Sequence, residues 1–217
     1  MLKTMSEAEA PKPRFRGVSH QYAFFASIIA GLILVLKLSP ADHQLGPGIF
    51  ALALSGLLGT SALYHRVNWK KATTKAWMRR LDHTMIFVLI AGTFTPFAMA
   101  NSGDPQTQRM LKILWGAVAV GMIFKLFWVA APRWITAGTY VVVGSLGGLS
   151  FPSMLESEGP LCVALVASGG VAYIVGALVY AMKKPNPWPQ SYGYHEIFHA
   201  LVIVGACLHY SAVAVLT

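Results

Sequence analysis

Seven apolar runs, each long enough to cross a lipid bilayer, occupy most of this 217-residue chain. A transmembrane helix needs roughly 20 predominantly apolar residues, because the hydrocarbon core is about 30 Å thick. Charged residues make up only 12% of the chain, about half of the usual share in a soluble domain. The pattern predicts an all-α, multi-pass membrane protein with seven transmembrane helices, at approximately residues 21–38, 47–65, 83–100, 110–131, 134–151, 160–182 and 196–215.

The polar segments between these runs are short, so the sequence predicts no separate soluble domain. We divide the chain into an N-terminal tail at residues 1–19 and a transmembrane domain at residues 20–217. The tail is polar and basic and lacks the apolar stretch of a secretory signal. Cys162 and Cys207 both lie in apolar runs, and they form neither a disulfide framework nor a Cys-x-x-Cys metal motif.

Basic residues are distributed unevenly over the connections. The connections on one side of the membrane hold only Lys37, Arg109 and Lys112. Lys125 lies inside the fourth run and can snorkel toward the interface. Cytoplasmic connections are enriched in lysine and arginine, so we expect a cytoplasmic N-terminus, an external C-terminus and a location in the cell membrane. Because the basic residues lie in short segments between apolar runs, they also argue against a nucleic-acid partner. The tail and the alternate connections hold Lys3, Lys12, Arg14, Arg16, Arg66, Lys70, Lys71, Lys75, Arg79, Arg80, Arg133, Lys183 and Lys184.

Several ionisable residues lie where this orientation places the cytoplasmic leaflet. His65 ends the second run, Asp82 precedes the third, and His195 and His199 lie at the start of the seventh. His20 lies just before the first run. Ionisable side chains are costly inside a membrane unless they pair with one another or bind a metal, so each one is a candidate functional residue.

The histidines have the spacing of metal ligands. His195 and His199 are four residues apart, so they share one face of a helix and suit two ligands of one zinc ion. His65 completes a three-histidine site with water in the fourth position, the open arrangement of catalytic zinc. Asp82 then accepts a hydrogen bond from that water and acts as general base. Ser61, one turn before His65, lies on the same face and can contact water or substrate.

Each residue also has a structural interpretation. His65 alone is typical of an interfacial polar residue, Asp82 can cap the third helix or pair with Arg79 or Arg80, and Ser61 can bond to a carbonyl one turn earlier. The segment from His195 to His199 also fits the His-Glu-x-x-His pattern of metalloproteases, in which Glu196 would be the base. These alternatives remain open from the sequence.

Four segments resemble the hemolysin III family, the bacterial branch of the progestin and adipoQ receptor (PAQR) family. They are Ser61–His65, Leu81–His83, Ala91–Phe97 and Gly193–His199. The resemblance implies a seven-helix fold, zinc held by His65, His195 and His199, and Asp82 and Ser61 beside the metal. It also implies ceramidase-like hydrolysis of a lipid.

We therefore expect a zinc-dependent hydrolase of amide or ester bonds in a membrane lipid. Two non-enzymatic alternatives remain. Zinc can be structural, in a receptor-like or membrane-homeostasis protein, or the chain can be a pore-forming cytolysin, as the family's bacterial name implies. The sequence identifies neither the lipid nor the oligomeric state.

Overall fold

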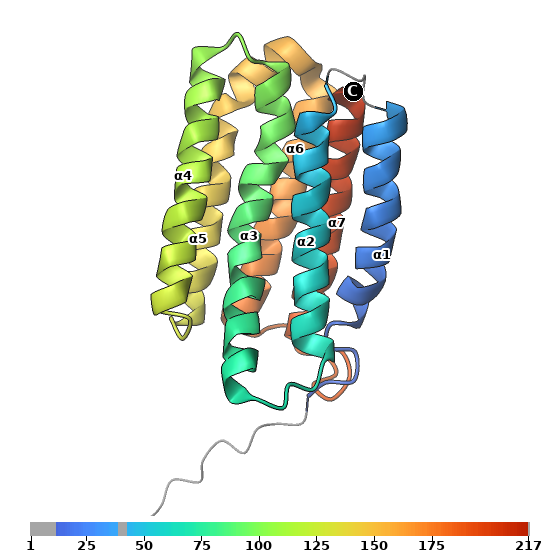
Figure 1. Cartoon of the computed structure of the whole chain (residues 1–217), viewed down its shortest axis with the longest axis vertical. Helices are drawn as coiled ribbons and strands as arrows, with labels where there is room; N and C mark the ends of the chain where they lie inside the picture. Colours follow the sequence, from blue (N-terminus) through green and yellow to red (C-terminus); the bar gives the residue numbers. More distant parts are fainter. Residues whose placement is uncertain (1–11, 39–42, 217) are drawn as a thin grey trace, which may run out of the picture.

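The computed structural model describes residues 12–38 and 43–216, and the helices in these ranges run side by side along the long axis of the molecule (Figure 1). The only β-bridge in the described ranges pairs Trp188 with Tyr192, so this part of the chain is all-helical. The elements are α1 Val18–Ile33, the π-helix η1 Leu34–Leu38, α2 Leu45–Arg66, α3 Ala72–Ala100, α4 Pro105–Phe127, α5 Arg133–Leu146, the 3-10 helix η2 Gly147–Ser150, α6 Phe151–Met182 and α7 Tyr194–Leu216.

Six helical segments of the described chain are long and apolar enough to cross a membrane. The fifth of them is the continuous stretch Arg133–Met182, which contains α5, η2 and α6. This stretch folds back on itself, because the guanidinium of Arg133 lies 5.6 Å from the ring centre of Tyr180 near its other end. Figure 1 shows the same reversal between α5 and α6. Gly159, with φ of 81°, interrupts the helix just before Pro160.

Helix α3 begins eleven residues before the third apolar run. The basic residues Lys75, Arg79 and Arg80, expected in a loop, therefore lie on its first turns. Neither glycine nor proline occurs between Ala72 and Asp82, so nothing in this segment opposes helix formation. Asp82 lies well inside α3, and the interpretation of Asp82 as its cap is wrong.

Consecutive helices pack against one another, and contacts between α1 and α7 close the bundle. One core cluster joins η1, α2, α3, α6 and α7 around Phe50, Leu57 and Val213, and a second joins α3 to α4 around Phe87 and Leu114. Large apolar side chains also cover the outside of the bundle, where they suit contact with lipid.

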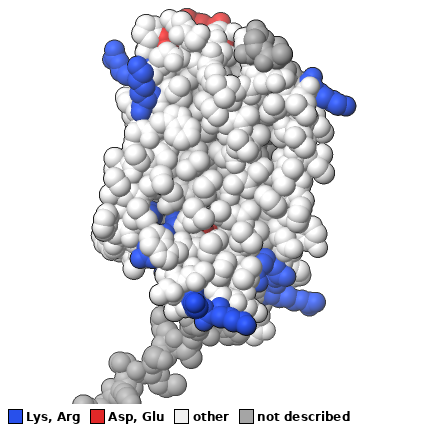
Figure 2. Space-filling view, in the orientation of Figure 1, with Lys and Arg blue, Asp and Glu red and all other residues white. Residues whose placement is uncertain are grey.

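Charged side chains gather at the two ends of the bundle (Figure 2). Most basic side chains visible in this view lie at the end that holds the α2–α3 connection, and the largest visible acidic patch lies at the opposite end. Lys3 falls outside the described residues. Lys125 does not snorkel as expected: it is fully buried, and its Nζ donates to Thr136 Oγ1 at 2.7 Å.

Candidate metal centre

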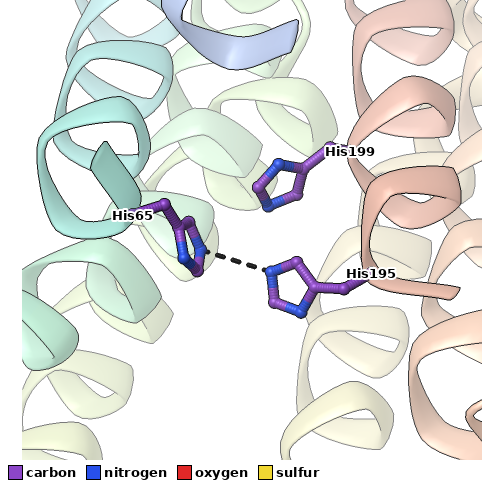
Figure 3. Close-up of side chains that lie close together, drawn as sticks. All are labelled: His65, His195 and His199. Carbon is purple, nitrogen blue, oxygen red and sulfur yellow. Dashed lines mark hydrogen bonds between the residues drawn. The ribbon is translucent and has the colours of Figure 1, made fainter. Parts of the chain in front are cut away.

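Three histidines converge where the last turn of α2 meets the first turns of α7. Helix α2 ends at the same end of the bundle at which α7 begins (Figure 1), so residues 130 positions apart become neighbours. His65 Nε2 lies 3.2 Å from His195 Nε2, and one ring nitrogen from each of His65, His195 and His199 lies within 4.8 Å of the others. Figure 3 shows the three rings facing a common space.

The donor set fits a zinc ion. Two nitrogens bound to one tetrahedral zinc at about 2.0–2.1 Å lie roughly 3.3 Å apart, close to the 3.2 Å between His65 and His195. His199 Nδ1 is buried and has no hydrogen-bond partner among the described residues. His65, His195 and His199 are therefore the residues that would hold the metal.

His20 is a fourth histidine at this site; it is buried, and no specific role for it was predicted from the sequence. Its ring stacks on that of His199, with centroids 3.8 Å apart and an interplanar angle of 8°. Its Nε2 donates to the backbone carbonyl of His199 at 3.3 Å, and its Nδ1 lies 2.8 Å from Ser61 Oγ. Since a carbonyl only accepts, His20 Nε2 carries the hydrogen in its bond to His199. His20 thus braces a metal ligand and orients the serine.

Asp82 and Ser61 lie beside the triad rather than within it. The side chain of Asp82 interacts with that of Ser61, and its Oδ2 lies 3.5 Å from His83 Nδ1. The structure thus joins α1, α2 and α3 through His20, Ser61 and Asp82. No ion pair of Asp82 with Arg79 or Arg80 is present within the described part of the chain.

Glu196 is occupied by other contacts. Its carboxylate forms an ion pair with Arg16, and its Oε2 accepts from the backbone N–H of Gly193 at 2.8 Å. Only 2% of the Glu196 side chain is exposed. These bonds hold the carboxylate against the N-terminal segment, which weakens the metalloprotease interpretation.

The N-terminal segment closes the site from the end of the bundle. Backbone N–H groups of Arg14 and Phe15 donate to carbonyls of Gln190 and Ser191. Gly17 then turns the chain into α1 with φ of 78°, and a Cβ at this position would lie 2.5 Å from His65 Cβ. Only glycine suits both the left-handed backbone and the close approach to His65.

A cavity of about 490 Å³ leads from the histidines into the bundle. Ser61, Asp82, His195 and His199 line it at the metal end. Its other walls are mostly apolar and come from α3, α5, α6 and α7, including Ile90, Phe94, Val141, Phe151, Val166 and Ile174. Such a cavity suits an apolar chain whose polar head lies at the histidines.

All five residues proposed from the sequence therefore lie at one site, with His65, His195 and His199 as the cluster and Asp82 and Ser61 beside it. The roles of His20 and of the Arg16–Glu196 pair were not evident from the amino-acid sequence. The depth of His20 in the membrane could be predicted from its position just before the first apolar run. The direction in which its side chain points around the axis of α1 could not.

Comparisons with known proteins indicate the family of the chain. The sequence model described as "Haemolysin-III related" matches residues 8–210. The chain is 32% identical to "Hemolysin-3 homolog" of Bacillus subtilis (strain 168) over 158 residues, which is 73% of this chain and 70% of that protein. It is 30% identical to "Hemolysin-3" of Bacillus cereus over 203 residues, 90% of this chain and 87% of that protein.

A human protein is also similar. "Monocyte to macrophage differentiation factor" of Homo sapiens is 22% identical over 198 residues, which cover 90% of this chain and 80% of the human one. These matches confirm the resemblance of the motifs to the hemolysin III and PAQR family. With a matched region that spans nearly the whole chain and apolar helices able to cross a bilayer, this multi-pass membrane protein belongs to the haemolysin-III-related family.

Proposed function

We propose that this protein is a zinc-dependent hydrolase that cleaves an amide or ester bond of a membrane lipid. The observation that carries the proposal is the convergence of His65, His195 and His199 at the head of an apolar cavity. Three imidazoles are the ligand set of an open, catalytic zinc site. A long apolar cavity inside a membrane protein favours a lipid as the substrate.

We propose further that the chain crosses the membrane seven times, with its N-terminus in the cytoplasm. The reversal between α5 and α6 supports two spans within Arg133–Met182, and the basic end of the bundle supports the orientation. The histidines would then lie near the cytoplasmic leaflet. In a chain with Cys162 and Cys207 replaced by serine, a membrane-impermeant thiol reagent should label Lys70→Cys only from the cytoplasmic side. Labelling of intact cells would reverse the orientation.

The side chains divide the chemistry between them. A zinc ion, when bound, supplies a Lewis acid that polarises a carbonyl and lowers the pKa of a coordinated water. Asp82 would accept the proton of the attacking water, because its carboxylate lines the cavity beside the triad. Ser61, whose side chain contacts His20 and interacts with Asp82, presents its lone pairs as an acceptor for an amide N–H or for water. The apolar walls would hold the acyl chain and exclude bulk water.

The test compares two carboxylates in purified, zinc-loaded protein, offered ceramides, N-acylethanolamines and phospholipids. Asp82→Asn should keep its zinc and lose about 100-fold or more in hydrolysis rate, the usual effect of removing a general base. Glu196→Gln should keep both zinc and hydrolysis, because Glu196 is bonded to Arg16 and Gly193. Hydrolysis by Asp82→Asn together with an inactive Glu196→Gln would assign the base to Glu196. A zinc-loaded wild type that cleaves none of these lipids would favour structural zinc.

A cytolysin is the second candidate, and its support is the similarity to "Hemolysin-3" of Bacillus cereus over 90% of the chain. A lytic activity independent of the metal would be the same for the wild type and for a His65→Ala/His199→Ala variant. Release of haemoglobin from red cells by both proteins at equal rates would favour the cytolysin. If neither protein releases haemoglobin, the cytolysin hypothesis loses its support.

A further inference from the structure

A second group of polar side chains lines the same cavity, well away from the histidine triad. It consists of Thr93 on α3, Tyr173 on α6 and His209 on α7. His209 lies ten residues beyond His199, or about 15 Å along the helix. Thr93 lies a similar distance beyond Asp82, and Tyr173 lies about 10 Å from Tyr180, which packs against His195. Three helices thus bring polar groups to one level of an otherwise apolar cavity.

Each of these side chains has one polar atom without a hydrogen-bond partner among the described residues. Thr93 Oγ1, Tyr173 Oη and His209 Nδ1 are all buried, and none of them is bonded to any described residue. Thr93 and His209 are each only 7% exposed. Most buried polar groups in proteins are paired, and leaving one unpaired is costly. Three unpaired groups at one level of a cavity indicate a place for a polar ligand group.

The contacts of His209 determine what that ligand group must offer. His209 Nε2 lies 3.0 Å from the backbone carbonyl of Val166, and because a carbonyl only accepts, Nε2 carries the hydrogen. In the neutral ring Nδ1 is therefore an acceptor. Gly169 leaves room for the His209 ring, since a side chain at this position would overlap it. The ring of Tyr173 lies 5.2 Å from that of His209, and its hydroxyl can donate or accept.

We propose that Thr93, Tyr173 and His209 form a subsite for a hydroxyl group carried partway along a lipid chain. This inference rests on the proposed function, in which the chain occupies the cavity and its reacting bond lies at the triad. A hydroxyl donates to His209 Nδ1 and accepts from Tyr173 or Thr93. A carboxylate or a phosphate only accepts, and an unsubstituted chain leaves all three groups unpaired. The subsite therefore selects hydroxylated lipid chains over plain ones.

The test compares ricinoleate with oleate, two fatty acids that differ only by a hydroxyl in the middle of the chain. Titration calorimetry on the zinc-loaded protein in nanodiscs should show roughly three- to tenfold tighter binding of ricinoleate, the effect of one well-placed hydrogen bond. The variants Tyr173→Phe and Thr93→Val remove hydroxyls with little change of shape. The double variant should lower the ratio of the two affinities, because only the hydrogen bond to His209 Nδ1 remains, while oleate binds as before.

Tyr210→Phe is the matched control. Tyr210 follows His209 on α7, but its hydroxyl donates to the carbonyl of Ala30, and it does not line the cavity. This variant should keep the preference for ricinoleate. Equal binding of both acids by the wild type, or an undiminished preference for ricinoleate in the double variant, would overturn the subsite.

Zinc content and lipid hydrolysis are measured on the same preparations, so the two proposals fail separately. A preference for ricinoleate without hydrolysis would leave the subsite standing and remove the hydrolase. Lipid hydrolysis without a preference for ricinoleate would support the hydrolase and remove the subsite.

Discussion

Asp82 and Asp104 lie at opposite ends of the bundle and differ in how far their carboxylates are satisfied. Asp104 caps α4: it accepts from the backbone N–H groups of Gln106 and Thr107, from the Thr107 hydroxyl, and from Ser153 Oγ at 2.8 Å. These hydrogen bonds, led by that of the Thr107 side chain, lower the pKa of Asp104 to about 2. Its lone pairs are used to join α4 to α6.

Asp82 has fewer partners. It interacts with Ser61, lies 3.5 Å from His83 Nδ1 and faces the cavity beside the histidines. A carboxylate has about four lone-pair sites, so Asp82 keeps acceptor capacity that Asp104 has already used. The contrast teaches that hydrogen-bond saturation, rather than residue type, separates a carboxylate that stabilises the fold from one available for chemistry.

The largest expected effect comes from removing donors at the Asp82 end. The double variant His65→Ala/His199→Ala should lose nearly all bound zinc, because a single remaining imidazole cannot hold the ion against competing chelators. Mass-spectrometric metal analysis of the purified protein measures this directly. His43→Ala, which changes a histidine in the connection before α2, is the matched control and should keep its zinc. Equal zinc in all three proteins would remove the metal centre from this end.

An intermediate effect is expected when the support of the triad is removed without touching a ligand. His20→Phe keeps an aromatic ring against His199 but loses both hydrogen bonds of His20. Loss of such outer contacts typically lowers metal affinity about 10- to 100-fold, and competition with a fluorescent zinc chelator measures the change. His20→Gln, which can still bond Ser61, should recover part of the affinity. Unchanged affinity in His20→Phe would reduce His20 to a packing residue.

The smallest effect is expected at the Asp104 end, and it is visible only at low pH. Since the folded-state pKa of Asp104 lies below the unfolded value near 4, its stabilisation is present above that value. The stabilisation is lost as the pH falls from about 4 toward 2. Asp104→Asn keeps a capping acceptor that does not titrate, so its Tm should fall less steeply than that of the wild type in this window. Parallel Tm curves would show that Asp104 is not saturated as described, and the contrast with Asp82 would fail.

Much of the site was predictable from the sequence because it depends on position along the helix axes. His195 and His199 share a face through their spacing alone, and the motifs around Ser61, His65 and Asp82 indicated the family. The helical membrane character was equally accessible, since it follows from the apolar runs. The start of α3 was harder to predict, because basic residues are compatible with either a helix or a loop.

Tertiary structure alone decided which groups meet across helices. In a membrane protein both the buried and the lipid-facing sides of a helix are apolar, so amphipathic periodicity is a poor guide to rotation about the axis. The stacking of His20 on His199, the pairing of Arg16 with Glu196 and the orientation of Thr93, Tyr173 and His209 toward one cavity all depend on that rotation. The sequence determined the membrane solvent, the family and the depth of the polar residues. Packing determined the direction of each side chain, and so decided which histidines face one another and which face a cavity.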